Sequence, residues 1–207
     1  MCCGGVTRFI HSPPVRAAMT ISTVDARPLD RRDALAMLAA AVAVNVVGAL
    51  GVPFTATGSA WFASLTLPAF YPPNWAFGVV WPVLYALMGV AVVLVVRAGR
   101  ARVASSAERA RDGFATASGF IPDNRPTRVA LGLFGLQLAV NVAWSPVFWG
   151  LERPDLGLVV LAALLVLVPA TIVAFDRLDR RAALLLVPYL AWVGFATALN
   201  YAIWAAN

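Results

Sequence analysis

Long apolar stretches alternate with short polar segments along this chain. No charged residue occurs between Asp33 and Arg97, and the prolines and glycines near the middle of this run predict two apolar segments joined by an uncharged connection. A transmembrane helix needs about 20 mostly apolar residues to cross the hydrocarbon core of a bilayer. Five segments are long enough, and they span residues 34–53, 77–96, 129–150, 156–175 and 182–206. The pattern therefore predicts an all-α membrane protein, a bundle of five transmembrane helices.

The composition agrees with this prediction and excludes several other classes of protein. Hydrophobic residues make up 61% of the chain and charged residues only 13%, whereas soluble domains contain about 45–50% apolar and about 25% charged residues. A disordered chain would be less hydrophobic, and a disulfide scaffold would need more than the two cysteines present here. The net charge of +6 requires no nucleic-acid partner, because arginines beside anionic headgroups of the lipid bilayer explain it.

The positions of the basic residues predict the orientation of the chain in the membrane. All 16 basic residues are arginines, and basic residues concentrate in the cytoplasmic loops of membrane proteins. If the N-terminus is cytoplasmic, the inner segments are residues 1–33, 97–128 and 176–181, which hold 15 of the 16 arginines. Only Arg153 would then lie outside. We therefore expect a multi-pass protein with a cytoplasmic N-terminus and an external C-terminus.

Two polar segments are expected to lie in the cytoplasm. Residues 1–33 are polar, mixed in charge and interrupted by prolines, which favours a mobile N-terminal tail before the membrane domain of residues 34–207. The two cysteines and the only histidine belong to this tail, but a metal site there is less favoured than a mobile terminus, and we expect no metal. Residues 97–128, which are rich in arginine, are expected to form a partly disordered cytoplasmic loop.

No Asp, Glu, Lys, Arg or His lies within any of the five predicted spans. Proton pumps and many ion-coupled carriers place ionisable groups inside the membrane because their mechanism moves charge, so this class is disfavoured. The usual axial ligands of haem iron are also missing from the spans. No catalytic residue and no required cofactor are expected, and a tetrapyrrole ligand would have to be held by stacking and shape.

The third predicted span has two distinct faces. One face carries polar and aromatic residues, namely Gln137, Asn141, Trp144 and Phe148. Roughly opposite lies a small-xxx-small row formed by Gly135, Ala139 and Ala143. Such rows let two helices approach closely, so the row predicts contact with a neighbouring helix or a second subunit. The polar face is expected to point into the bundle, either to line a ligand site or only to hydrogen-bond between helices.

Aromatic residues also share faces in two other spans. Trp81, Tyr85 and Met88 lie on one face of the second span, and Trp192 shares a face with Ala196 in the fifth. In the expected orientation the indoles of these spans and of the third span could converge in the outer half of the membrane. Apolar walls with few polar groups are typical of small-molecule sites, and flat ligands gain from stacking on indole. Core packing without a ligand is the alternative.

The remaining tryptophans near the ends of the spans are Trp75, Trp149 and Trp204. Tryptophan is enriched where a membrane protein meets the headgroup region. We therefore interpret these three as interfacial anchors rather than as ligand-binding residues.

Several short motifs are together specific enough to indicate a protein family. They are Trp61-Phe62, Pro72-Pro73, Trp81, Leu84-Tyr85-Ala86-Leu87-Met88-Gly89, Gln137 to Ser145, and Pro188-Tyr189-Leu190-Ala191-Trp192. In these motifs the chain resembles the TspO/MBR family, the tryptophan-rich sensory or translocator proteins. The resemblance implies a five-helix bundle, often dimeric, whose cavity is capped by the connection between the first two helices. It also implies binding of porphyrins and related tetrapyrroles, and in some members binding of sterols or isoquinoline-type drugs. Some members are also associated with light-dependent breakdown of porphyrin.

The resemblance assigns roles to individual positions. Cavity tryptophans map to Trp81 and Trp192, and the polar wall maps to Asn141 with Trp144. The small position of the fifth helix maps to Ala196, and the lid maps to Trp61, Phe62 and Pro72. Tyr85 and Gln137 are expected to help orient the ligand. The family's dimer often uses small residues of the third helix, which agrees with the row at Gly135, Ala139 and Ala143.

Three functions are compatible with the sequence. The favoured one is a membrane receptor or sensor that binds a porphyrin-type tetrapyrrole, with a transport or regulatory output. The second is an enzyme that degrades porphyrin in light, which is less favoured because the spans contain no acid–base or metal apparatus. The third is a membrane scaffold that acts through the arginine-rich segment 97–128.

Overall fold

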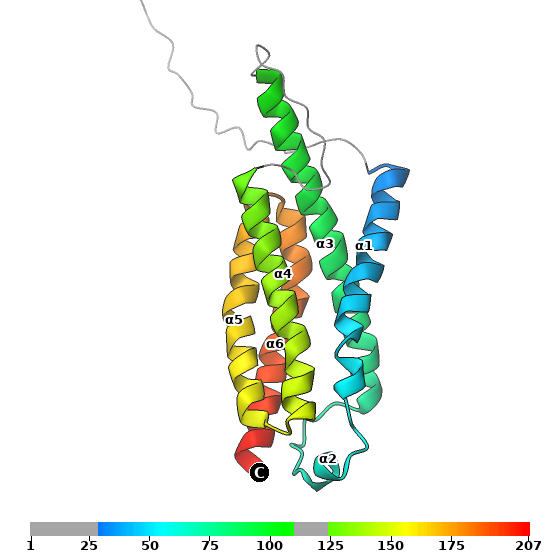
Figure 1. Ribbon diagram of the computed structural model, residues 1–207, viewed down its shortest axis with the longest axis vertical. Helices are drawn as coiled ribbons and strands as arrows, with labels where there is room; N and C mark the ends of the chain where they lie inside the picture. Colours follow the sequence, from blue (N-terminus) through cyan, green and yellow to red (C-terminus); the bar gives the residue numbers. More distant parts are fainter. Residues whose placement is uncertain (1–28, 110–123) are drawn as a thin grey trace, which may run out of the picture.

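Five long helices form the membrane domain of the protein in a computed structural model that describes residues 29–109 and 124–207 (Figure 1). They are α1 (Arg31–Ala49), α3 (Asn74–Arg109), α4 (Arg125–Ser145), α5 (Pro154–Asp176) and α6 (Arg180–Ala206). Each is long and apolar enough to cross a membrane. The described residues contain no strand, so the predicted all-α bundle of five spanning helices is confirmed. The predicted N-terminal tail lies almost entirely outside the described residues.

The first helix begins three residues before the predicted span, at Arg31. Asp30 caps it, because its side chain accepts a hydrogen bond of 2.8 Å from the backbone N–H of Asp33, and the Asp33 carboxylate accepts one of 3.1 Å from the backbone N–H of Asp30. This reciprocal capping satisfies backbone donors that the helix itself leaves unpaired. Asp33 also forms an ion pair of 2.8 Å with Arg97, which connects α1 to α3 at this end of the bundle.

Helix α3, which contains the second predicted span, does not end where the membrane is expected to end. α3 continues to Arg109 and extends beyond the other helices (Figure 1), so the prediction that residues 97–109 belong to a loop is wrong. This stretch contains mainly arginine and alanine with no proline, and such a sequence can remain helical after it leaves the bilayer. The rest of the expected loop is also shortened, because Asn124 caps α4 through the backbone N–H of Thr127 at 2.9 Å. Residues 110–123 lie outside the described part of the chain.

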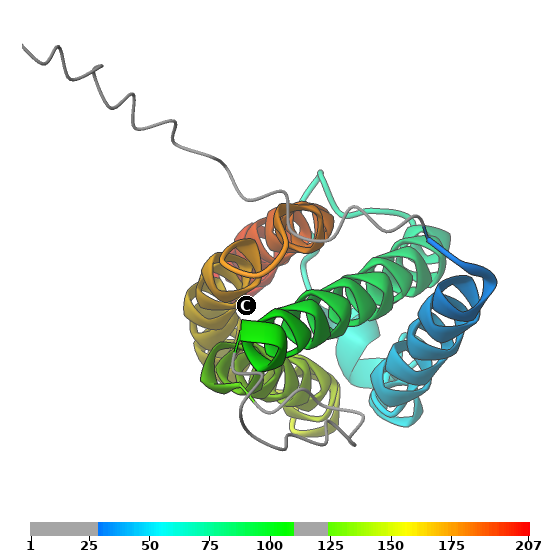
Figure 2. The ribbon, with the colours of Figure 1, turned by 90° about the horizontal axis from the view of Figure 1, so that it is seen from above.

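The helices pack as one bundle in which α1 lies at the side of α3 (Figure 2). α5 packs against both α4 and α6, and α3 packs against α6. Gly89 allows α1 and α3 to approach closely, because a Cβ atom at this position would lie 2.5 Å from the backbone nitrogen of Ala41. The small-residue row of α4 is exposed at all three positions, Gly135, Ala139 and Ala143. It therefore faces away from the bundle, as a contact with another subunit would require.

The connection between α1 and α3 covers the end of the bundle opposite the extension of α3 (Figure 1). It contains the short helices η1 (Val52–Phe54) and α2 (Ala60–Ser64). The side chain of Asn207 ties this connection to the end of α6, because its oxygen accepts a hydrogen bond of 2.9 Å from the backbone N–H of Thr66 and its nitrogen donates to the Thr66 carbonyl at 3.3 Å. The connection is thus held as a cap.

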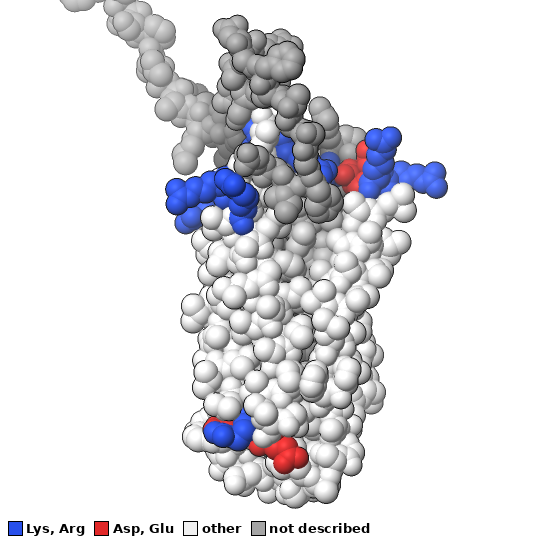
Figure 3. Space-filling model, in the orientation of Figure 1, with Lys and Arg blue, Asp and Glu red and all other residues white. Residues whose placement is uncertain are grey.

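Charged side chains lie at the two ends of the described molecule (Figure 3). The face shown between these ends is uncharged over the length of the helices. Such a band suits the hydrocarbon region of a bilayer, where charged groups are costly. The protein is therefore a multi-pass integral membrane protein.

Candidate ligand-binding cavity

A cavity of about 550 Å³ lies beneath the cap. All five long helices and the connection contribute to its wall. The aromatic residues that line it are Phe62, Tyr71, Phe77, Trp81, Tyr85, Trp144, Phe148, Trp149 and Trp192. No lining residue in the described part of the chain carries a formal charge, and burial raises the pKa of the Tyr71 phenol above its ordinary value. The volume falls within the range of about 300–1,000 Å³ that is typical of small-molecule sites.

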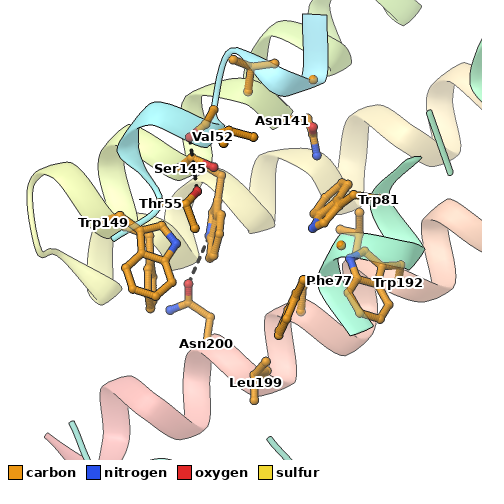
Figure 4. Close-up of a pocket in the computed structure, with 18 of the residues that line it drawn as sticks. Val52, Thr55, Phe77, Trp81, Asn141, Ser145, Trp149, Trp192, Leu199 and Asn200 are labelled. Atoms are coloured by element: carbon orange, nitrogen blue, oxygen red, sulfur yellow. Dashed lines mark hydrogen bonds between the residues drawn. The ribbon is translucent and has the colours of Figure 1, made fainter. Parts of the chain in front are cut away.

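One wall of the cavity is formed by two tryptophans from different helices (Figure 4). The ring centroids of Trp81 and Trp192 are 6.2 Å apart with an interplanar angle of 84°, an edge-to-face arrangement that aromatic rings prefer. Phe77 continues this wall, with its ring 5.8 Å from that of Trp192. The helical spacing that places Trp81 and Phe77 one turn apart on α3 brings both rings to the same side of the cavity.

A second aromatic wall faces the cavity from α4 and its π-helical continuation η2 (Pro146–Gly150). Trp144 stacks on Phe148 with ring centroids 4.8 Å apart and an interplanar angle of 19°. The indole N–H of Trp144 donates to the side-chain oxygen of Asn200 at 3.2 Å, and the Asn200 amide donates to the Pro154 carbonyl at 2.8 Å. These two bonds connect α4, α5 and α6, and they fix the orientation of the Trp144 ring.

A buried polar pair, Tyr85 and Asn141, lies at the inner end of the cavity. The Tyr85 hydroxyl donates to the side-chain oxygen of Asn141 at 2.7 Å. Trp81 stacks on the Tyr85 ring with centroids 5.3 Å apart. The Tyr85 ring also needs a glycine at position 48, because a Cβ atom there would lie 2.1 Å from the ring. Since its oxygen is bound by Tyr85, Asn141 presents its amide nitrogen to the cavity (Figure 4).

Seven of the ten predicted ligand-binding residues line this cavity, namely Phe62, Trp81, Tyr85, Asn141, Trp144, Trp192 and Ala196. Three do not. Gln137 is buried one turn further into the bundle than Asn141, and its amide atoms have no hydrogen-bond partner among the described residues. Trp61 turns its ring toward Phe148, at 5.6 Å, and Pro72 lies in the connection beside the lining residue Tyr71. Ligand binding by any of these residues remains a prediction.

Trp149 does not have the exposed position expected of an interfacial anchor. It is 8% exposed, and its ring lies 4.6 Å from that of Phe62, so it joins the cap to η2. The other two expected anchors, Trp75 and Trp204, are 70% and 48% exposed. The physical reason for the difference is the cap, which covers the end of α4 and converts a surface position into a buried one.

Seven polar lining residues were not predicted from the sequence, and they are Asn45, Thr55, Thr57, Tyr71, Asn74, Ser145 and Asn200. Asn200 follows Ala196 by one helical turn and could have been found from this spacing. Asn45 is the only amide in the first predicted span, and its nitrogen donates to the backbone carbonyls of Ala41 at 2.9 Å and Pro82 at 3.3 Å. No pattern in the sequence signals Thr55 or Thr57, because irregular connections have no fixed period. Asn74 begins α3 and lies seven residues, about two helical turns, before Trp81.

Fold and cavity together define a class, the integral membrane proteins in which five helices surround an uncharged aromatic cavity. Within this class the chain belongs to the TspO/MBR family, whose model matches residues 37–205. It is 37% identical over 174 residues to the tryptophan-rich protein TspO of Archaeoglobus fulgidus, covering 84% of this chain and 97% of the relative. It is 37% identical over 150 residues to the human translocator protein, covering 72% and 76%. It is 34% identical over 167 residues to a tryptophan-rich sensory protein of Cereibacter sphaeroides, covering 81% and 86%.

Proposed function

We propose that this protein is a membrane receptor that binds porphyrin-type tetrapyrroles in the cavity beneath the cap, with transport or regulation as the output of binding. The observation that carries the proposal is the pair of facing aromatic walls, one around Trp81 and Trp192 and one around Trp144. A large flat ring can stack on indole and phenyl faces without any metal bond. The names of the relatives, which describe a sensory and a translocator protein, support such an output.

Titration of the purified protein with protoporphyrin IX, followed by tryptophan fluorescence, tests the proposal. We expect Trp81→Leu and Trp192→Leu each to weaken binding about 2- to 12-fold, because an aromatic pair contributes about 0.5–1.5 kcal/mol beyond the burial of its area. Trp75→Leu is the matched control, since Trp75 is 70% exposed and does not line the cavity. Equal affinity in all three variants would exclude the cavity as the binding site.

The topology is part of the same proposal. In the described residues the arginines gather at the end from which α3 extends, and Arg153 alone lies at the other end (Figure 3). We propose that the arginine-rich end is cytoplasmic, so the capped end of the bundle lies on the outer side. A reporter enzyme fused after Asn207, active only outside the cytoplasm, should be active, and an inactive but stable fusion would contradict this orientation.

Light-dependent porphyrin degradation is a second candidate function. It is favoured by the contiguous series of oxidisable rings formed by Trp192, Trp81 and Tyr85. Illumination of the porphyrin complex in air should then bleach the porphyrin absorbance faster in the wild-type protein than in Trp81→Phe. Bleaching at the rate seen in empty detergent would remove this candidate and leave the receptor proposal intact.

A further inference from the structure

Two polar side chains in the core of the bundle have no hydrogen-bond partner among the described residues. Gln137 is 1% exposed and Tyr189 is 0% exposed. Neither the nitrogen nor the oxygen of the Gln137 amide forms a hydrogen bond there, and the Tyr189 hydroxyl forms none. Inside a membrane such groups have no access to bulk water, and buried polar groups of native proteins almost always bind the protein or an ordered water. These two side chains therefore need a partner that the described part of the chain does not supply.

Both side chains lie one helical turn below the inner end of the cavity. Asn141 on α4 and Val193 on α6 are buried lining residues. Gln137 precedes Asn141 by four residues and Tyr189 precedes Val193 by four, a step of about 6 Å along each helix. α4 and α6 both begin at the end opposite the cap (Figure 1), so both steps lead away from the cavity. Helical side chains lean toward the start of their helix, and these two lean in the same direction.

The unpaired groups converge beside the polar pair of Tyr85 and Asn141. Tyr189 lies close enough to both of these side chains to interact with them, yet its hydroxyl completes no hydrogen bond with either. The Asn141 oxygen is already bound by the Tyr85 hydroxyl at 2.7 Å. Gln137 lies on the same buried face of α4 as Asn141. The free donors and acceptors thus belong to one small region between α4 and α6.

Water is the molecule that matches these groups. The Gln137 amide offers two N–H donors and an acceptor oxygen, and the Tyr189 hydroxyl can donate and accept. A buried water molecule also donates and accepts, and it typically makes about three hydrogen bonds to groups that are otherwise unsatisfied. An ion would be held poorly here, because no charged residue in the described part of the chain is buried and the same residues contain no cluster of metal ligands.

We propose that Gln137 and Tyr189 bind ordered water in the membrane core, at a site between α4 and α6 one turn below the cavity. The water bridges the Gln137 amide and the Tyr189 hydroxyl, and it thereby joins two helices that both pack against α5. The site is independent of the proposed tetrapyrrole ligand, because neither Gln137 nor Tyr189 lines the cavity. Failure of the receptor proposal would therefore leave the water site standing.

The bound water can be observed directly, because Gln137 is the only glutamine of the chain. Protein labelled with 15N in the glutamine side chain alone gives a single pair of amide resonances. In rotating-frame Overhauser spectra of the ligand-free protein in detergent, we expect cross-peaks between this pair and water, with the sign that distinguishes a dipolar contact from chemical exchange. Tyr189→Phe should weaken these cross-peaks because the water loses one partner. Tyr201→Phe, which removes a hydroxyl from a residue that is 57% exposed, should leave them unchanged.

Two results of this experiment would overturn the proposal. The first is a wild-type spectrum without a dipolar cross-peak between the Gln137 amide and water. The second is a cross-peak that Tyr189→Phe leaves as strong as in the wild-type protein, since the water would then not be bound by Tyr189.

Stability measurements test whether the same water serves both groups. Gln137→Met and Tyr189→Phe remove polar atoms with little change of shape. If water bridges the two groups, each single variant leaves the other group with an unmet bond, and we expect the Tm to fall by about 2–12 °C. The double variant removes both partners and should lose clearly less than the sum of the two.

The other outcomes of this cycle contradict the proposal. A higher Tm in either single variant would mean that its polar group has no partner in the wild-type protein. Fully additive losses would mean that the two groups share no water. Coupling between the variants in a protein without water cross-peaks would mean that the two side chains bind each other directly.

Discussion

Removal of one hydroxyl group from Tyr85 tests the polar pair on which the inner end of the cavity depends. Tyr85 and Asn141 are 8% and 5% exposed, and the hydrogen bond between them measures 2.7 Å. Tyr85→Phe keeps the ring in its place between Trp81 and Gly48 but leaves the Asn141 oxygen without its donor. A buried polar group left unpaired in this way costs about 1–3 kcal/mol.

For a chain of this size, each kcal/mol of lost stability corresponds to about 2–4 °C in Tm. We therefore expect Tyr85→Phe to lower the Tm of the detergent-solubilised protein by about 2–12 °C, measured by circular dichroism at the helical signal. Tyr201→Phe is the matched control, because Tyr201 is 57% exposed on the outer surface of α6. The control should unfold like the wild-type protein.

A double-mutant cycle separates the hydrogen bond from other effects of the substitution. Asn141→Leu removes the acceptor, so adding Tyr85→Phe to this variant should cost much less than it costs in the wild-type protein. Full additivity of the two losses, or a Tm of Tyr85→Phe equal to that of Tyr201→Phe, would refute the reasoning that this bond organises the site.

Three other predictions concern the packing of the helices. Gly89→Ala should lower the Tm while Gly194→Ala should not, because a Cβ atom at Gly89 would lie 2.5 Å from the backbone of α1 whereas one at Gly194 would meet nothing within 4 Å, and overpacking costs about 1–3 kcal/mol. Gly157→Ala should weaken protoporphyrin binding, since its Cβ atom would lie 2.7 Å from the Asn200 oxygen that orients Trp144; unchanged affinity would show that this contact is unimportant. Ala139→Leu should shift a dimer toward monomer in light-scattering measurements if α4 forms the homodimer expected from its small-residue row, and an unchanged mass would exclude this face.

Helical periodicity identified the residues that face inward, but the sequence did not give their depth. Gln137 and Asn141 lie on one face of α4, and both are buried, yet only Asn141 reaches the cavity. The depth of the cavity floor is set by side chains from other helices, among them Tyr85, which contacts Asn141 across the bundle. Periodicity within one helix carries no information about such contacts.

The hydropathy pattern predicted which segments span the membrane, but it did not predict where each helix ends. α3 continues to Arg109 because its backbone hydrogen bonds can form in water as well as in lipid, and no proline occurs between Arg97 and Arg109. The position of Trp149 was misjudged for a related reason. Whether a tryptophan near the end of a span meets headgroups or is covered by a cap depends on the path of the connection, which has no periodic pattern.

The sequence alone determined the number of spanning helices, because a bilayer accepts a backbone only when its hydrogen bonds are satisfied within the segment. It also determined the inward face of each helix, because helical spacing fixes which side chains lie on the same side. Tertiary structure alone decided which inward residues meet at the cavity. The Trp81–Trp192 contact, the bond between Tyr85 and Asn141 and the burial of Trp149 each join segments distant in the chain. Their geometry follows from how closely neighbouring helices pack, and this depends on glycines such as Gly48 and Gly89 whose partners no local pattern reveals.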